Sequence, residues 1–409
     1  MGTGLRLMEA LLTSEESTKL EYERKSGERN GGIHRKDIVT LFGTVKSIPR
    51  EYYWNSTRKD SAGERKCGHY VFDERLGLVG RYTPAVVNEV LRLAATHDYE
   101  EAAVDFSKAH GFPLSPDTLR DIVLSCAAKV GDFMQLSGAQ ESEVRQPLAY
   151  VLADGTGIHM FHKYLEGVKG KKGAPTTREV KLAAFFTGEM KKAKPFRHKG
   201  STTYVATTER WEDFGRLARV EYDRRFPLKP IDTIFLTDGG KWLRSVHDNF
   251  FPFATMILDL FHALEHLKEI MSLLGMREGS EEWKNTYRKW KRTIKAGRVK
   301  SVIKQIEDKV RGSEKASEVD KKLNYYRENI DRMHYDEYIL KGWFVGSGVV
   351  ESGCKCVVKQ RLGNSGMHWS LKGAEPVLGI RALYKSNRLE EFCNWMVKDL
   401  RQVRFLNAA

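Results

Sequence analysis

The sequence has no long apolar run and few cysteines, and both features restrict what the protein can be. No run approaches the roughly 18 apolar residues that cross a bilayer. The N-terminal residues also lack the basic and apolar regions of a secretory signal. Five cysteines in 409 residues are few and odd in number, which is typical of free thiols in a reducing compartment. We therefore expect a cytoplasmic protein without a membrane segment.

Several common catalytic and metal-binding motifs are missing as well. The chain has no P-loop, no dinucleotide-binding glycine fingerprint after a strand and no Gly-x-Ser-x-Gly nucleophile motif. These absences disfavour a nucleotide triphosphatase, a dehydrogenase and a serine hydrolase. Cys67-Gly68-His69 and Cys354-x-Cys356 are each incomplete as zinc motifs, so a structural zinc is also disfavoured.

Positive charge is what the sequence has in excess. Lys and Arg number 68 against 54 Asp and Glu, which gives a formal net charge of +14. Soluble proteins this basic commonly bind polyanions, because phosphates attract Lys and Arg and release counterions; the alternative is a protein that is merely basic. Hydrophobic residues make up 41% of the chain, which is enough for a sizeable core.

The N-terminal region, residues 1–82, is predicted to contain a small antiparallel sheet. Its β-type runs cover 38–42, 45–48 and 51–54, and Gly43 between the first two suits a hairpin.

Residues 83–145 are predicted to be a helical module. Apolar residues at helical spacing begin at Val86, a second helix covers 100–110, and Ser115 with Pro116 starts a third. A helix, a turn and a helix ahead of a catalytic region are typical of a helix-turn-helix DNA-binding module. An ordinary helical bundle explains the same pattern, and both interpretations stay open.

From Leu148 onward the pattern is that of an α/β domain with an all-helical insertion. We expect the first part of the domain at 146–265, the insertion at 266–342 and the second part at 343–409. The predicted strands are 149–153, 180–186, 204–207, 233–237 and 254–258.

Three acidic residues beside glycines are candidates for chemistry. Asp154 and Asp238 each follow a predicted strand and precede Gly, and Glu351 lies near the start of a predicted helix. Converging carboxylates repel one another unless cations join them, and such hard oxygen ligands suit Mg²⁺ or Mn²⁺. A single Asp-Gly after a strand is more often a turn. Three such motifs in a basic protein favour a site for two metal ions acting on a phosphodiester.

The predicted helix around Glu351 combines this acid with cations. Ser347 can cap the helix, and Glu351, Lys355 and Lys359 share one flank at i, i+4 and i+8. That flank would carry a metal ligand followed by two phosphate-binding cations; the alternative is a simple Glu–Lys pair. The buried stripe is predicted to be Val350, Cys354, Val357 and Val358. Further DNA-binding candidates beyond the helix are Arg361 and Trp369.

Asp259 and His262 form a fourth element of the candidate site. They lie three residues apart, so they share one face of a predicted helix. The two side chains can act together near a metal, and a purely structural histidine explains the same spacing.

The segment from Lys284 to Lys304 contains nine Lys or Arg and no Asp or Glu. Its aromatic stripe of Trp283, Tyr287 and Trp290 is interpreted as core packing. The opposite basic face, including Lys289 and Arg292, is a candidate for contact with a polyanion, with a merely solvated face as the alternative.

Taken together, these motifs resemble prokaryotic insertion-sequence transposases of the ISKra group. The resemblance covers about residues 37–395. The segments that carry it are Ala153–Gly157, Arg178–Lys181, Thr237–Gly239, Ile257–Leu267, Val345–Lys355, Val358–Leu362 and Ser365–Ser370.

The resemblance implies an RNase H-like catalytic domain with an Asp-Asp-Glu metal triad. Asp154, Asp238 and Glu351 match the triad, and Asp259 with His262 is similar to an Asp-x-x-His signature of transposases with helical insertions. Such enzymes use two Mg²⁺ (or Mn²⁺) ions to cleave DNA at the ends of their element. The freed 3′-hydroxyl then attacks target DNA. The expected partners are double-stranded DNA, both terminal repeats and target, and further copies of the chain.

One departure from the family pattern concerns the N-terminal region. Related proteins often carry a Cys-x-x-Cys-type knuckle there, whereas this region has no cysteine other than Cys67. Two other functions remain open from the sequence: a transposase-derived DNA-binding protein without catalysis, and a metal-dependent nuclease of the same fold.

Overall fold

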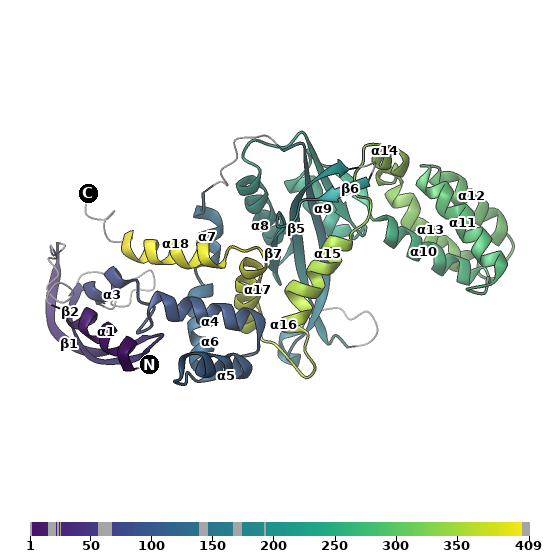
Figure 1. The fold of residues 1–409 in the computed structure, drawn as a ribbon. Coiled ribbons are helices and arrows are strands. Elements are labelled where there is room, and N and C mark those ends of the chain that lie inside the picture. The colour runs from purple at the N-terminus through teal and green to yellow at the C-terminus, as the bar shows by residue number, and fades with distance from the viewer. Residues whose placement is uncertain are drawn as a thin grey trace. The chain divides into compact units, whose positions relative to one another are not determined.

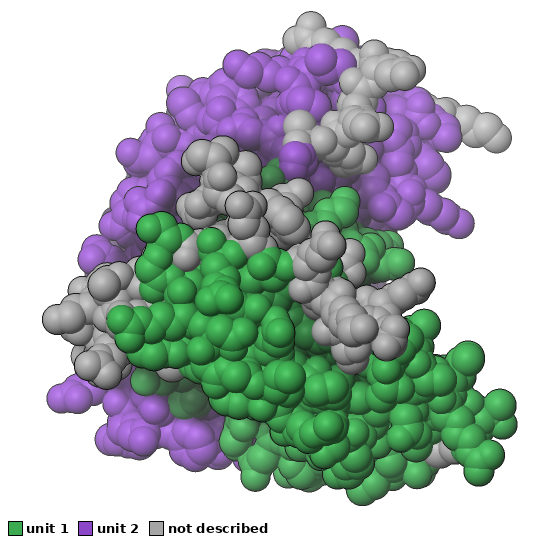
Figure 2. Space-filling view, turned by 90° about the vertical axis from the view of Figure 1, so that its left-hand side faces the viewer, with its two compact units in different colours: residues 1–137, 370–409 green, residues 138–369 purple. Residues whose placement is uncertain are grey.

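The protein is described by a computed structural model as a mixed α/β structure with many helices (Figure 1). The described residues are 2–14, 22, 24, 26–55, 68–138, 146–166, 174–191 and 194–402. The chain forms two compact units, 1–137 with 370–409 and 138–369, which Figure 2 colours separately. Among the described residues, no helix has the length and apolar character needed to cross a bilayer.

Unit 1 begins with helix α1 (Gly2–Thr13) and a three-stranded antiparallel sheet. Strands β1 (Glu28–Thr40) and β2 (Gly43–Asn55) form a hairpin in which Thr40 faces Gly43, as predicted. The runs 45–48 and 51–54, predicted separately, are parts of one strand. Strand β3 (His69–Tyr70) and helix α3 (Val71–Leu76) complete this part. Its core contains Leu12, Ile38, Val45, Ile48, Phe72 and Leu78.

The helices of the rest of unit 1 confirm the helical prediction. They are α4 (Pro84–Thr96), α5 (Tyr99–His110), α6 (Pro116–Ala127), α7 (Val130–Leu136), α17 (Leu371–Lys385) and α18 (Leu389–Gln402). Ser115 caps α6 by accepting a hydrogen bond from the Thr118 amide at 3.2 Å. Gly111 ends α5 in the left-handed conformation that glycine adopts without strain.

The C-terminal helices belong to a different unit from the one that the sequence predicts. Helix α17 packs against α4 and α6, and α18 packs against α4. Buried Arg381 donates a hydrogen bond to the backbone carbonyl of Ala95. Residues 370–402 therefore belong to unit 1, although the sequence grouped them with the second part of the catalytic domain.

Unit 2 is built on a six-stranded mixed sheet with the order β6-β5-β4-β8-β9, and β7 also pairs with β5. Strand β4 is antiparallel to β5 and parallel to β8, which in turn is parallel to β9. The strands are β4 (Leu148–His159), β5 (Thr177–Lys191), β6 (Lys194–Arg197), β7 (Thr203–Thr207), β8 (Asp232–Thr237) and β9 (Thr255–Leu258).

All five strands predicted in this unit are present, but the first is longer than expected. Strand β4 continues past Asp154 to His159 because its antiparallel pairing with β5 persists to that residue. Its parallel pairing with β8 ends at Leu152. Asp154 therefore lies within strand β4, just after the pairing of β4 with β8 has ended and while its pairing with β5 continues.

Helices pack on this sheet and connect its strands. Helix α8 (Trp211–Arg225) packs against β5, β7 and α9 (Lys241–Phe250). A short 3₁₀ turn, His162–Tyr164, follows β4. The helix that starts at Gly348 consists of α15 (Gly348–Gly353), a π-helical segment (Cys354–Lys359) and α16 (Gln360–Leu362), and its first two parts contact β4. The predicted stripe of Val350, Cys354, Val357 and Val358 is buried.

The region between β9 and α15 is helical, as predicted, and begins slightly earlier than predicted. Helix α10 (Leu260–Leu273) contacts α11 (Glu281–Lys295) and α13 (Ala316–Asn329), and both contact α12 (Val299–Val310), so the four close into a bundle (Figure 1). A 3₁₀ turn (Ile330–Arg332) and α14 (Tyr335–Leu340) follow.

The aromatic stripe of α11 is largely core, as interpreted from the sequence. Trp290 is 1% exposed and its indole N–H donates to the Gln305 side chain at 3.2 Å. Trp283 and Tyr287 are half-buried and stack with ring centroids 5.0 Å apart.

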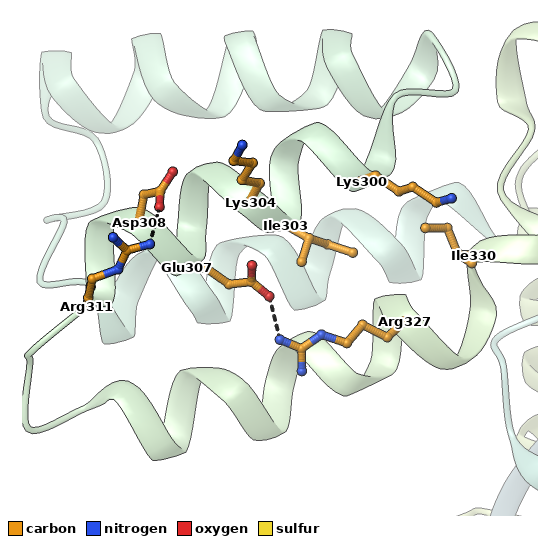
Figure 3. A pocket seen from close by; sticks show the side chains of 8 residues that line it. All are labelled: Lys300, Ile303, Lys304, Glu307, Asp308, Arg311, Arg327 and Ile330. Atoms are coloured by element: carbon orange, nitrogen blue, oxygen red, sulfur yellow. Dashed lines mark hydrogen bonds and ion pairs between the residues drawn. The ribbon is translucent and has the colours of Figure 1, made fainter.

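A shallow groove lies between α12 and α13 (Figure 3). Its acids are paired with neighbouring cations, Glu307 with Arg327 at 2.6 Å and Asp308 with Arg311 at 2.7 Å. The remaining lining residues are Lys300, Ile303, Lys304 and Ile330.

The packing of α15 on the sheet gives a first prediction. A Cβ atom at Gly353 would come within 2.8 Å of Leu182 and 3.0 Å of Tyr204, and Leu182 is fully buried. Gly353→Ala should therefore lower the free energy of unfolding by about 1–3 kcal/mol, as overpacking does.

The matched control is the same change at Gly348, where a Cβ atom would meet nothing within 4 Å. Gly348→Ala should be neutral or stabilising by up to about 1 kcal/mol. Chemical denaturation of the two variants and the unsubstituted chain tests this, and equal stabilities at both positions would contradict the packing described for α15.

Candidate metal centre

The sheet register brings three aspartates to one edge of the sheet. Strands β4 and β8 pair Leu152 with Leu236, so two residues further on Asp154 lies level with Asp238. Strands β8 and β9 pair Thr237 with Leu258, so one residue further on Asp238 lies level with Asp259. All three strands run in the same direction. The three carboxylates therefore lie side by side, just beyond the last residues at which the strands pair.

Asp154 is a partly buried carboxylate in contact with the helix that carries Glu351. Its Oδ2 accepts a hydrogen bond from the Cys354 thiol at 3.5 Å. Burial raises the pKa of Asp154, and the negative charge of Asp238 raises it further. Burial also raises the pKa of the Cys354 thiol, with the nearby Asp154 charge acting in the same direction. Cys354 is therefore a protonated donor in this arrangement.

Asp238 lies in a tight loop between β8 and α9. Its Oδ1 accepts a hydrogen bond from the Gly240 amide at 3.0 Å, and its backbone carbonyl accepts one from the Tyr325 hydroxyl at 2.9 Å. Gly239 has φ of +93°, a conformation that side-chain-bearing residues rarely adopt. The conformation of this loop is thus stabilised by the Gly240 amide within the loop and by the Tyr325 hydroxyl of helix α13.

Asp259 is fully buried and is the centre of the hydrogen-bond network. Its Oδ1 accepts from the Phe261 amide at 2.7 Å and so caps helix α10. Its Oδ2 accepts from the His262 ring Nδ1 at 2.9 Å and from the Ser347 hydroxyl. The Asp259 hydrogen bond is the largest of the effects that raise the pKa of His262 to about 9, and the Asp238 charge adds to it.

Glu351 is joined to the same network through Ser347. The Ser347 hydroxyl lies 2.6 Å from Glu351 Oε1 and also contacts Asp259 Oδ2. The prediction that this side chain caps the helix is wrong, because its hydroxyl makes no capping hydrogen bond. A hydroxyl has one proton and cannot donate to two carboxylates at once. Both acids therefore lie against the same hydroxyl, which can donate to only one of them at a time.

In the part of the chain that the structure describes, one group of side chains could hold a metal ion. Ligand atoms of Asp259, His262 and Glu351 all lie within 4.8 Å of one another. Two carboxylates and an imidazole fit a divalent cation such as Mg²⁺, Mn²⁺ or Zn²⁺. Because Asp259 holds His262 Nδ1, the ring's Nε2 is left for a metal, in the manner of a carboxylate–histidine–metal arrangement. A cation bound there would displace the Nε2 proton of the protonated ring, while the Nδ1 proton stays hydrogen-bonded to Asp259.

The predicted triad and this group overlap in one residue. Glu351 belongs to both, whereas the sequence placed Asp259 and His262 in a supporting role. Asp154 and Asp238 interact electrostatically with each other, and each interacts with His262. The assignment of Asp154, Asp238 and Glu351 as the catalytic and metal-binding triad stays a prediction.

Three contributors to the site were missed or misassigned from the sequence. Ser347 was expected to be a helix cap, Cys354 a core residue, and Tyr325 was not singled out. Only Ser347 carried a signal, because it lies four residues ahead of Glu351 in a glycine-rich stretch.

The predicted DNA-binding side chains fall into exposed and buried sets. Lys355 and Lys359 are exposed, as are Lys289 and Arg292 on α11. Arg361, in contrast, is 1% exposed and its guanidinium lies over the Trp369 ring, 5.4 Å from its centre. The Trp369 indole N–H donates to the Leu362 carbonyl at 3.0 Å. Arg361 is thus buried and Trp369 partly buried at the end of the helix, and their assignment as DNA-binding residues stays a prediction.

The prediction that the chain lacks a structural zinc is not tested. Cys67 lies outside the described residues, and Cys126, Cys354, Cys356 and Cys393 form no disulfide bonds with one another. The His69 ring nitrogens contact Glu74 at 2.8 Å and Glu28 at 3.2 Å.

Comparison with known proteins gives little further information. No family model matches the sequence, and no curated protein matches it. Among solved structures the chain is weakly similar to the Drosophila P element transposase strand transfer complex, with a TM-score of 0.26 and 9% sequence identity. The match covers 80% of this chain and 83% of that chain. A TM-score this low establishes neither the fold nor the family of the chain.

The clustered ligand atoms predict Mn²⁺ binding. Glu351→Gln and Asp259→Asn should each weaken Mn²⁺ affinity about tenfold or more, because each removes a charged oxygen ligand or the partner that orients His262. Titration of free Mn²⁺ followed by electron paramagnetic resonance measures the affinity.

The control is Glu278→Gln, which removes the same charge from an exposed acid of the bundle that lies outside the group. This variant should bind Mn²⁺ as the unsubstituted chain does. Equal affinities for all four proteins would show that the group does not bind the metal.

Proposed function

We propose that the chain is a DNA transposase with an RNase H-like catalytic domain that cleaves and joins DNA strands with Mg²⁺ or Mn²⁺. The observation that carries the proposal is the convergence of Asp154, Asp238 and Asp259 on one sheet edge, with Glu351 hydrogen-bonded into the same network. The net charge of +14 supports a polyanionic substrate.

The sheet supports the proposed fold type. Its first long strand, β4, lies centrally, with antiparallel β5 on one side and parallel β8 and β9 on the other. Asp154 lies on this first strand, Asp238 follows β8, and Glu351 lies on a helix after a helical insertion. This is the distribution expected of an Asp-Asp-Glu enzyme with an insertion, and it accounts for the 113 residues between Asp238 and Glu351.

In the proposed reaction Asp154, Asp238 and Glu351 hold two divalent cations, with Asp259 and His262 beside them. Such ions activate the attacking oxygen and stabilise the leaving oxygen of a phosphodiester. Asp259 orients His262 and, through Ser347, fixes Glu351. The protonated Cys354 thiol donates to Oδ2 of Asp154 at 3.5 Å, and the Gly155 amide donates to Oδ1 at 2.7 Å, so both donors hold this carboxylate in place.

The chemistry has two steps. Hydrolysis places the oxygen of water on phosphorus, breaks the bond from phosphorus to the 3′ oxygen, and leaves a 3′-hydroxyl and a 5′-phosphate. In strand transfer that 3′-hydroxyl attacks a target phosphodiester, loses its proton, and displaces the target's own 3′ oxygen. Because two element ends must react, we propose that more than one copy of the chain assembles on the DNA.

Cleavage of DNA that spans the ends of the element tests the proposal. With Mg²⁺ or Mn²⁺ the unsubstituted chain should nick at the element boundary. Asp154→Asn, Asp238→Asn and Glu351→Gln should each reduce the rate by about a thousandfold or more, since a metal interaction of several kcal/mol is lost and 1.36 kcal/mol corresponds to a factor of ten.

DNA binding of the three variants, measured by gel shift, should remain, and Glu278→Gln should cleave normally. Retained cleavage in any triad variant would remove that residue from the site. Tight binding without cleavage by the unsubstituted chain would favour the transposase-derived DNA-binding protein. Cleavage without joining of a pre-cut 3′-hydroxyl end would favour the nuclease.

The exposed lysines after Glu351 give a separate prediction. Lys355→Ala with Lys359→Ala should weaken DNA binding and lower the slope of log affinity against log salt concentration by about 2, since each phosphate contact contributes about 0.9. Fluorescence anisotropy at several salt concentrations measures the slope, and an unchanged slope would place these lysines away from the DNA.

A further inference from the structure

One side of helix α11 carries a row of cations. Lys284, Arg288, Arg292 and Lys295 recur at i, i+4, i+8 and i+11, with Lys291 beside them, so they lie along one flank. Trp290 and Ile294 face the core of the bundle instead. The row spans eleven residues, or about 16 Å at 1.5 Å per residue.

Most of these cations have no acidic partner among the residues that the structure describes. Lys284 pairs with Glu281 at 3.0 Å. Arg288 donates only to the neutral amide of Asn285. No ion pair with any residue that the structure describes is formed by the other four cations, Arg288, Lys291, Arg292 and Lys295. Like charges at this spacing repel, so a polyanion laid along the row would relieve the repulsion.

The neighbouring helix α10 extends the row. The ammonium nitrogens of Lys268 on α10 and Lys291 on α11 lie over the same Tyr287 ring, 5.9 Å and 5.6 Å from its centre. Lys268 is exposed and, like the others, has no ion-pair partner among the described residues. We call Lys268, Arg288, Lys291, Arg292 and Lys295 the cationic edge.

The cationic edge leads toward the candidate metal centre. Helices α10 and α11 are consecutive and pack together, and Tyr287 lies beside Lys268. Because the two helices run in opposite directions, later residues of α11 lie beside earlier residues of α10. Lys295 therefore lies near the level at which α10 begins, where Asp259 and His262 are. The distance along α10 from its first residue to Lys268 is about 12 Å.

We propose that the cationic edge binds the sugar-phosphate backbone of duplex DNA that extends from the candidate metal centre. The inference rests on the proposed function, which supplies the DNA. From Arg288 to Lys295 the cationic edge covers about 10 Å at 1.5 Å per residue, which matches roughly three base-pair steps at 3.4 Å each. The contact is to phosphates, so it is independent of base sequence.

Two features of the bundle favour duplex DNA on this edge. The apolar face of α11 is covered by the bundle, so the helix has no free face to insert into a membrane surface. The other basic area of the bundle, the groove between α12 and α13, also presents Glu307 and Asp308 (Figure 3). Because these acids lie beside the lysines of the groove and repel phosphates, the groove is a less favourable binding surface for DNA than the cationic edge.

The test compares two triple variants of the full chain. Arg288→Gln, Arg292→Gln and Lys295→Gln together remove three charges from the cationic edge. The matched control removes three charges from exposed lysines of the same bundle, Lys309→Gln, Lys315→Gln and Lys321→Gln. Both bind a fluorescein-labelled duplex of arbitrary sequence, about three helical turns long, in anisotropy measurements over a range of salt concentrations.

The edge variant should bind more weakly, and its slope of log affinity against log salt should fall by about 3. The control should keep the slope of the unsubstituted chain. An equal fall in both variants, or in neither, would overturn the proposal, as would an edge effect seen with an RNA duplex of the same sequence but not with DNA.

Thermal melting and Mn²⁺ affinity show that the substitutions leave the fold and the metal centre intact. Both quantities should match those of the unsubstituted chain. The slope comparison does not depend on cleavage. A chain that binds duplex DNA through this edge but never cuts it would overturn the proposed function and leave this inference standing.

Discussion

Three aspartates lie at one edge of the unit 2 sheet with Glu351 of helix α15 beside them, and the repulsion among these carboxylates is the constraint on which the rest of the site depends. Parallel pairing of β4, β8 and β9 places Asp154, Asp238 and Asp259 in neighbouring positions, and Ser347 draws Glu351 to Asp259. Such a cluster is tolerable only if protons, donors or cations offset the negative charge. Three backbone amides, an imidazole, a hydroxyl and a thiol donate hydrogen bonds to these carboxylates and offset part of the charge.

The same edge explains how the four-helix bundle and the sheet belong to one compact unit. The Asp259 amide donates to the Thr237 carbonyl at 2.7 Å, and the Leu260 amide donates to Val345 at 2.8 Å, so the start of the bundle is tied to the end of β8 and to the chain ahead of Glu351. Tyr335 donates to the Leu258 carbonyl at 3.0 Å. With Tyr325 on the Asp238 carbonyl, the bundle supports the loops that carry the acids.

Local chemistry was enough to predict most elements, but not how they meet. Caps and breakers such as Ser115 and Gly111 fix helix ends within a few residues, and buried apolar runs reveal strands. The hub role of Ser347 and the contact of Tyr325 with Asp238 depend on pairings 88 and 87 residues apart in sequence. Arg361 looked like a DNA contact from its charge alone, and only packing shows that its guanidinium covers Trp369.

The π-helical segment Cys354–Lys359 shows why a simple helical wheel misjudges this site. The prediction that Glu351, Lys355 and Lys359 share a flank assumes 3.6 residues per turn, whereas a π-helix bonds i to i+5 and turns its side chains by less per residue. Cys354 lies at the start of this wider segment, where its thiol reaches Asp154 while Val357 and Val358 stay buried. In this segment the Cys354 thiol contacts a carboxylate while the neighbouring valines stay in the core, and Lys355 and Lys359 both remain exposed.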